Sequence, residues 1–161
     1  MSATKDELKL QLDNARRYDL FALLEASASH AGLPLAYVLA IGSRETNLTN
    51  ELGDGGHGHG VLQIDDRSFP VLCKRSFRAQ PDLFIEQGCA LLASNLRWAR
   101  HHWPNYSEAY RLRIAADEYN CGPGNEVKAV ADGHADERTA HADYGADVMC
   151  RKAIFEELLK P

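Results

Sequence analysis

The chain has 161 residues, of which 45% are hydrophobic and 25% are charged, so a single domain with a substantial buried core is expected over residues 1–161. No apolar run approaches the roughly 20 residues of a membrane-spanning helix, and the first residues lack the basic-then-apolar pattern of a signal peptide. The net charge of −5 argues against nucleic-acid binding, which relies on clustered Lys and Arg.

The N-terminal third predicts three helices. Residues 4–7 have the capping-box pattern, Thr followed three positions later by Glu, and open a helical extension over residues 1–17. A second apolar stretch begins at Leu20 and ends at Gly32, a residue that commonly stops helices. Pro34 suits the first position of a third helix that runs to about Arg44. Glu45 would then lie at its C-terminal end.

A glycine-rich segment follows these helices. Residues 53–60 contain five of the chain's 12 glycines, and glycine at this density interrupts helices and allows close approach to a ligand. Residues 61–65 then alternate as in a short strand. We expect a small hairpin or sheet here, beside a cleft.

The remainder of the chain predicts further helices. One runs from Pro81 to about Trp103, one is capped by Ser107 and broken by glycine and proline at 122–124, and the last covers about 142–159. The fold class is therefore α+β, predominantly helical, with a minor β element.

Three carboxylic acids carry the candidate chemistry. A glutamate that closes an apolar helix is partly buried, and burial raises a carboxyl pKa because the charged form loses its hydration. Glu45 would then donate a proton near neutral pH. A glycosidase needs a second carboxylate, for which Asp54 and Asp65 are the candidates. The alternative is that these are ordinary capping, surface and turn carboxylates.

The histidines and cysteines indicate no cofactor. His57 and His59 are two residues apart without a third ligand, which favours water-exposed loop histidines over a metal site. The four cysteines allow three disulfide pairings, which the sequence does not separate; they are either small buried residues or disulfides. We expect neither metal nor cofactor.

Several short motifs occur in an order that resembles one enzyme family. These are Ser-Arg-Glu at 43–45, Gly-Asp at 53–54, Gly-Val-Leu-Gln-Ile-Asp at 60–65, Tyr-Asn-Cys-Gly-Pro-Gly-Asn at 119–125 and His-Ala-Asp-Tyr-Gly-Ala-Asp-Val at 141–148. Together they resemble the goose-type lysozymes, which share a helical lysozyme-like fold with the soluble lytic transglycosylases. The similarity extends from about residue 33 to 155.

The resemblance assigns roles by position. Glu45 matches the general acid, and Asp54 and Asp65 match the two aspartates that place or activate water. The residues expected to line the sugar-binding groove are Gln63, Tyr119 and Asn120, with Tyr144 as a further cleft tyrosine. The chain departs from the family pattern at Phe69, where a histidine is typical of the vertebrate proteins, at Cys121, and in a shorter 45–54 segment.

The resemblance implies a bacteriolytic muramidase that hydrolyses, with inversion, the β-1,4 linkage between N-acetylmuramic acid and N-acetylglucosamine. Its partners would be peptidoglycan glycan strands, chito-oligosaccharides and a proteinaceous lysozyme inhibitor. We expect a monomer that acts on the cell wall after secretion or phage delivery.

Two alternatives differ in their chemistry. A lytic transglycosylase forms a 1,6-anhydro product with one acid, and a Gln-x-Met-Pro pattern is typical of those enzymes where this chain has Gln63-Ile64-Asp65. A catalytically silent wall-binding module would need no acid at all. The presence of Glu45 with both aspartates favours hydrolysis.

Overall fold

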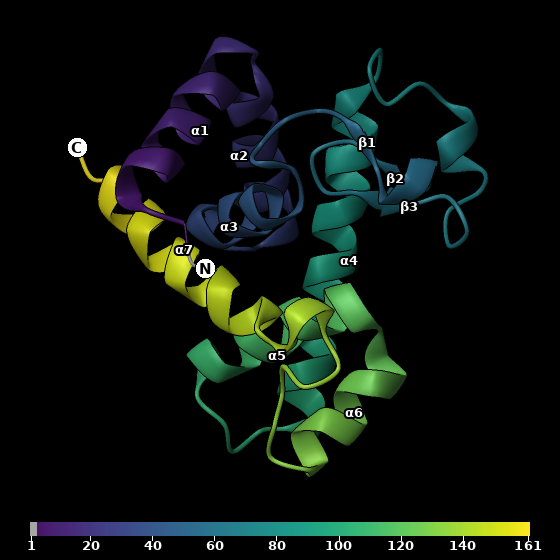
Figure 1. Cartoon of the computed structure of the whole chain (residues 1–161), viewed down its shortest axis with the longest axis vertical. Helices are drawn as coiled ribbons and strands as arrows, with labels where there is room; N and C mark the ends of the chain where they lie inside the picture. The colour runs from purple at the N-terminus through teal and green to yellow at the C-terminus, as the bar shows by residue number, and fades with distance from the viewer. Residues whose placement is uncertain (1–2) are drawn as a thin grey trace.

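The computed structural model describes residues 3–161, which form seven α-helices and a small sheet at one side of the molecule (Figure 1). The helices are α1 (Lys5–Arg17), α2 (Leu20–Ala31), α3 (Leu35–Thr46), α4 (Pro81–His102), α5 (Glu108–Cys121), α6 (Pro123–Ala131) and α7 (Tyr144–Leu158). The strands are β1 (Leu52–Gly53), β2 (Gly58–His59) and β3 (Ile64–Asp65). This is the α+β, predominantly helical fold that the sequence predicts.

The sheet is antiparallel and its strands follow chain order, β1-β2-β3. Leu52 pairs with His59, which in turn pairs with Ile64. A 3₁₀ turn, Asp54–Gly56, joins the first two strands. The sheet lies beside the N-terminal half of α4 and away from α6 (Figure 1), which confirms the expected small β element.

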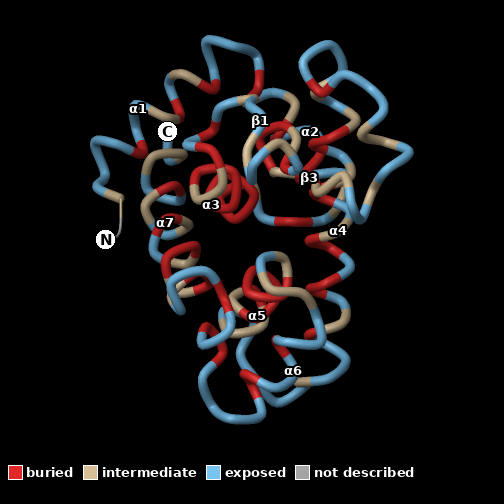
Figure 2. Tube along the Cα trace, turned by 45° about the vertical axis from the view of Figure 1, so that its right-hand side comes forward, coloured by how far each residue is buried: buried red, intermediate tan, exposed pale blue. Residues whose placement is uncertain are grey.

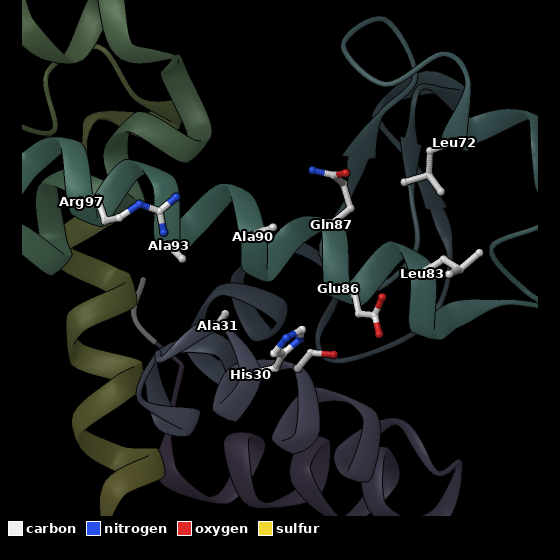
Figure 3. A pocket seen from close by; sticks show the side chains of 10 residues that line it. His30, Ala31, Leu72, Leu83, Glu86, Gln87, Ala90, Ala93 and Arg97 are labelled. Carbon is white, nitrogen blue, oxygen red and sulfur yellow. The ribbon is translucent and has the colours of Figure 1, made fainter.

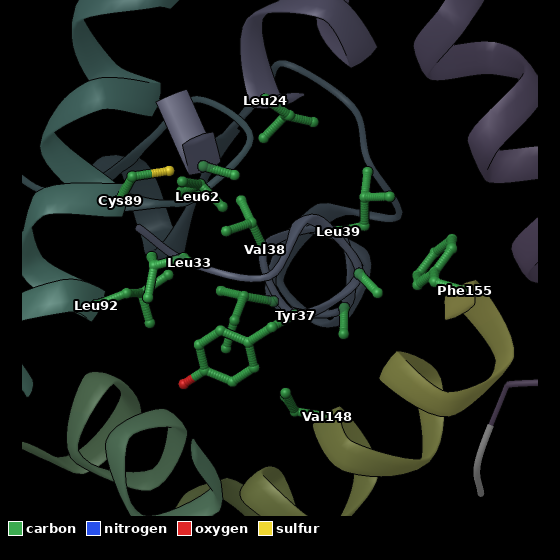
Figure 4. Close-up of a cluster of buried hydrophobic side chains, with 14 of the residues drawn as sticks. Leu24, Leu33, Tyr37, Val38, Leu39, Leu62, Cys89, Leu92, Val148 and Phe155 are labelled. Carbon is green, nitrogen blue, oxygen red and sulfur yellow. The ribbon is translucent and has the colours of Figure 1, made fainter. Parts of the chain in front are cut away.

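Helix α3 lies at the centre of the main core. Nine of its 12 residues are buried, and a helix that is buried on all sides packs against neighbours all around it. Figure 2 shows α3 as a nearly continuous buried segment. Apolar side chains from α2, α4 and α7 surround it, among them Leu24, Leu92 and Phe155 (Figure 4). This packing fixes the position of the C-terminal end of α3.

The expected helix ends agree closely with the structure. Thr4 and Glu7 form both hydrogen bonds of a capping box, the Ser107 hydroxyl accepts a hydrogen bond from the Tyr110 amide, and Gly32 ends α2 with a φ of 67°. Helix α1 buries three apolar residues, Leu8, Leu12 and Ala15, in the main core.

One expectation about secondary structure is wrong. Residues 61–65 do not form a continuous strand, since only Ile64–Asp65 pairs. Val61 and Leu62 instead turn into the main core, where their carbonyl oxygens accept hydrogen bonds from the hydroxyls of Thr46 and Tyr119. The break expected at 122–124 is confirmed, since α5 ends at Cys121. The sequence did not predict the helix beyond it, α6, whose first turn holds Pro123, a position where proline is favoured.

The cysteines form no disulfide within residues 3–161, where all four are free thiols. Cys89 is buried, and burial raises the pKa of its thiol to about 12. Across the same residues, no helix combines the length and the apolar character needed to cross a membrane.

Candidate active site

A cleft of about 450 Å³ lies where the end of α3, the sheet and the end of α5 meet. It is lined by Glu45, Glu51, Gly53, Asp54, Gly58, Gln63, Asp65, Arg67, Tyr119 and Asn120. The structure therefore brings together all the predicted site residues except Tyr144, although they come from three separate parts of the chain.

Glu45 occupies the last turn of α3 and is largely withdrawn from water. The Tyr144 hydroxyl donates a hydrogen bond to Glu45 Oε1, and the other face of the residue opens to the cleft. Burial raises the pKa of Glu45, while the Tyr144 hydrogen bond and the Arg44 charge partly offset that rise. The carboxyl is thus biased toward its protonated form, which can donate a proton.

Ion pairs hold the end of α3 against α7. Arg44 donates to Asp147 Oδ2 at 2.9 Å and to Asp143 Oδ1 at 2.8 Å. Arg151 donates to the same Asp147 oxygen at 2.7 Å and to the Ser43 hydroxyl at 2.8 Å. Because Arg44 and Ser43 directly precede Glu45, these contacts restrict how far the acid can move.

Tyr144 lies behind Glu45. Its side chain is 2% exposed, and Arg44 lies over its ring at 5.5 Å. In this structure it contacts the acid from the core side of the molecule and does not line the cleft.

Asp54 and Asp65 are in a wetter environment than Glu45. Asp54 begins the 3₁₀ turn after β1, and Asp65 ends β3; their side chains are 64% and 38% exposed. Both accept hydrogen bonds from Arg67, which lowers the pKa of Asp65. Asp65 is therefore an anion at pH values where Glu45 retains its proton.

Gln63 is held inside the hairpin by backbone groups. Its Nε2 donates to the carbonyl oxygens of Gly60 at 2.8 Å and Glu51 at 3.2 Å. A Cβ at Gly53 or Gly58 would lie 2.1 or 2.2 Å from Gln63 Oε1. The Gln63 side chain can therefore occupy this position only while both strands have glycine beside it. This explains two of the glycines in the segment 53–60.

The backbone is unusual at two residues of the cleft. Asp54 and Gln63 have φ values of 47° and 50°, a region that non-glycine residues rarely adopt. Such conformations cost about 1–3 kcal/mol and persist where surrounding contacts enforce them. For Gln63, hydrogen bonds from its side chain to the carbonyl oxygens of Glu51 and Gly60 provide such contacts.

Tyr119 and Asn120 form the wall at the end of α5. The Tyr119 hydroxyl donates to the Leu62 carbonyl at 2.6 Å, which ties this wall to the segment that precedes β3. Asn120 Oδ1 accepts from the Ala140 amide at 2.8 Å. Phe69 and Cys121 line a smaller hollow that adjoins the cleft and shares Tyr119 and Asn120 with it.

Sequence reasoning missed Glu51 and Arg67, which also line the cleft. Arg67 had no usable signal, because it lies in the turn after β3, where the alternation of a strand no longer applies. Glu51 had none, since its place follows from the turn between α3 and β1 rather than from a pattern.

A larger hollow of about 590 Å³ lies between α2 and α4. Its charged side chains, Glu86 and Arg97, lie far apart along α4 with apolar residues between them (Figure 3). It contains none of the predicted site residues. Its size alone therefore does not make it the better candidate for acid–base chemistry.

The histidine prediction is only half right. His57 is exposed and its Nδ1 lies 2.9 Å from Asp66 Oδ1, whereas His59 is only 14% exposed and packs against the rings of Phe77 and Phe84. His59 follows the alternation of β2, which turns it inward. Among the described residues, no group of three or more His, Cys, Asp or Glu side chains could hold a metal ion.

Comparisons with known proteins identify the family. The sequence model of Lysozyme g matches residues 10–158. Similar proteins include Lysozyme g of Struthio camelus, 27% identical over 98% of this chain and 74% of that protein. Lysozyme G of Dromaius novaehollandiae is 29% identical over 76% of this chain and 58% of its own length, and Lysozyme g of Gallus gallus is 29% identical over 76% and 56%. The chain thus belongs to the lysozyme g family, a family of glycoside hydrolases.

Proposed function

We propose that this protein is a peptidoglycan muramidase. It hydrolyses the β-1,4 linkage between N-acetylmuramic acid and N-acetylglucosamine and inverts the anomeric carbon. Glu45 is the general acid, and Asp54 and Asp65 position the attacking water. Gln63, Tyr119 and Asn120 form the groove that binds the sugar.

The observation that carries this proposal is the contrast between carboxylic acids within one cleft. Burial raises the pKa of Glu45, whereas the contacts of Asp65 with Arg67 lower the pKa of that carboxyl. Glycoside hydrolysis requires one carboxyl group that is protonated and a second that is ionised at the same pH. Environments that raise the pKa of one group and lower the pKa of the other provide such a pair. Structural carboxylates on a surface have no need of such a difference.

The proposed reaction proceeds in one displacement. Glu45 transfers its proton to the glycosidic oxygen as the bond from that oxygen to the anomeric carbon breaks. A water held by Asp54 and Asp65 attacks the same carbon from the other face of the ring, and an aspartate accepts the proton that the water loses. The carboxyls of inverting enzymes are about 6.5–9.5 Å apart, which leaves room for that water.

Glu45→Gln tests the acid because it preserves shape and removes the transferable proton. We expect turnover of bacterial glycan to fall at least about 10²-fold. Glu25→Gln is the matched control, since Glu25 is exposed on α2, outside the cleft. Unchanged turnover in Glu45→Gln would remove this residue from the mechanism.

The products separate hydrolysis from its alternatives. Mass spectrometry of digested glycan should show reducing N-acetylmuramic acid ends, and proton NMR should show the α-anomer first. Anhydro ends, lighter by one water, would identify a lytic transglycosylase. Pelleting with insoluble peptidoglycan, without any loss of turbidity of a cell suspension, would identify a silent wall-binding module.

The wider expectations belong to the same proposal. The substrates are peptidoglycan glycan strands and chito-oligosaccharides, and the protein acts as a monomer for which a proteinaceous lysozyme inhibitor is a partner. Size-exclusion chromatography with light scattering tests the monomer directly.

A further inference from the structure

Arg67 connects the two aspartates of the cleft. Its Nη2 donates to Asp54 Oδ2 at 2.6 Å and its Nε donates to Asp65 Oδ1 at 2.8 Å. The Arg67 backbone amide also donates to Asp65 Oδ1, at 2.9 Å. One guanidinium group therefore contacts both carboxylates, and it does so inside the cleft.

We propose that Arg67 is a positioning residue that holds Asp54 and Asp65 as one unit, with one oxygen of each carboxylate left to accept a hydrogen bond from the same water. The proposal rests on the hydrolytic function given above. It assigns to Arg67 a role through the aspartates and no contact with the reacting atoms.

The need for such a residue follows from the sheet. Asp54 follows β1 and Asp65 ends β3, and β2 lies between these strands. Neighbouring strands are about 4.8 Å apart, so the two backbones are separated by about twice that distance. Two exposed anions at this separation repel each other and choose their rotamers independently. The planar fork of arginine can donate to both at once.

The pattern of occupied oxygens supports the proposal. Arg67 engages Asp54 Oδ2 and Asp65 Oδ1. Among residues 3–161, no hydrogen bond to Asp54 Oδ1 or Asp65 Oδ2 accompanies these contacts. A water that donates one hydrogen to each of those oxygens keeps a lone pair for the anomeric carbon.

Stability does not explain the arrangement. The side chains of Arg67, Asp54 and Asp65 are 59%, 64% and 38% exposed, and exposed ion pairs contribute little to stability. Loss of Arg67 should therefore leave the fold intact. Its effect should be confined to the placement of the two aspartates and the ionisation of Asp65.

The test compares Arg67→Gln, Arg67→Lys and Arg67→Ala in the full chain, with a soluble chito-oligosaccharide as substrate. Arg67→Gln should lower kcat by about 10- to 100-fold, as expected for a misplaced catalytic group, with little change in KM. Lysine keeps the charge without the fork and should lower kcat less. Guanidinium ion added to Arg67→Ala should restore part of the lost rate.

The pH profile gives a readout that a merely structural role would not move. The charged and titratable groups facing Asp65 are Arg67 and His57, while Glu51 and Asp54 line the same cleft. Without the guanidinium, the pKa of Asp65 rises, so Asp65 is protonated at a higher pH. The acid limb of the plot of kcat against pH therefore moves to higher pH. In Arg67→Lys the acid limb should stay near its original position.

The effect of Arg67→Gln in a variant that lacks both carboxylates shows whether Arg67 acts through them. In an Asp54→Asn, Asp65→Asn background, Arg67→Gln should cause no further loss of kcat. Arg17→Gln, an exposed arginine on α1, is the matched control. An Arg67→Gln variant with unchanged kcat and an unchanged acid limb would overturn the inference. If Glu45→Gln is inactive while that result holds, the hydrolytic function stands and only the positioning role falls.

Discussion

Replacing Tyr144 by Phe removes one hydroxyl from the immediate environment of the proposed acid. That hydroxyl donates a hydrogen bond to Glu45 Oε1 from inside the core. The ring itself is buried and packs beneath Arg44, so phenylalanine should keep its place. The substitution therefore isolates the contribution of one hydrogen bond to the pKa of Glu45.

The sign and size of the effect follow from the contacts. A hydroxyl donates more strongly to a carboxylate than to a carboxylic acid, so the Tyr144 hydrogen bond lowers the pKa of Glu45 against the effect of burial. A hydrogen bond to a charged group is worth about 1.5–3 kcal/mol, and one pKa unit corresponds to about 1.4 kcal/mol. A neutral hydrogen bond is worth about 0.5–1.5 kcal/mol, and only the difference between the two shifts the equilibrium, so the pKa of Glu45 should rise by about one unit in Tyr144→Phe.

The measurement is kcat against pH on a soluble chito-oligosaccharide. Because the acid must be protonated to react, the alkaline limb should move to higher pH by about one unit, while the acid limb stays in place. Tyr110→Phe is the control, since Tyr110 packs between α5 and α6 away from the cleft. An alkaline limb that stays fixed, or that moves to lower pH, would refute the reasoning about Glu45.

Two further predictions concern the scaffold. Glu118 is buried, its Oε2 has no hydrogen-bond partner among residues 3–161, and burial raises its pKa to about 7. Ionisation of Glu118 in the folded protein should therefore lower the free energy of unfolding by about 3 kcal/mol. Stability should fall as pH rises from about 4.5 to 7, and urea unfolding should show a smaller fall for Glu118→Gln; an unchanged pH dependence would contradict this. Gly58→Ala places a Cβ 2.2 Å from Gln63 Oε1, so the Gln63 side chain must leave its position. We expect kcat/KM to fall at least about fivefold and the free energy of unfolding to fall by about 1–3 kcal/mol. A variant with normal kcat/KM would show that the place of Gln63 does not matter.

The helices were predictable because their signals are local. The capping box at Thr4, the hydroxyl of Ser107 and the proline that opens α4 each act within one turn of the residues that they organise. The end of α3, and with it the position of Glu45, followed from the same kind of reasoning. Such signals do not depend on what the rest of the chain does.

The region between β1 and α4 was predicted less well because its structure is set by distant contacts. Val61 and Leu62 leave the strand to enter the core, and their carbonyl oxygens find partners on α3 and α5. An alternating pattern cannot distinguish this from a strand. The inward turn of His59 against Phe77 and Phe84 has the same origin.

The candidate site was only partly readable for a related reason. The resemblance to a known family located the cleft residues, but the position of Tyr144 behind Glu45 depends on how α7 packs against α3. The two ion pairs of Arg44 with Asp143 and Asp147 span about a hundred residues of sequence. No spacing rule relates groups so far apart.

The different environments of the carboxylates follow from the elements that carry them. Glu45 belongs to the most enclosed helix of the molecule, so it is half-buried and core packing fixes the backbone that carries it. Asp54 and Asp65 belong to a sheet of two-residue strands, which is too small to bury them and keeps them in contact with water. A proton donor gains from the first setting and an anion that orders water gains from the second. The disadvantage of the exposed position is that the side chains can move, and among residues 3–161 Arg67 is the one cationic side chain lining the cleft that contacts both aspartates.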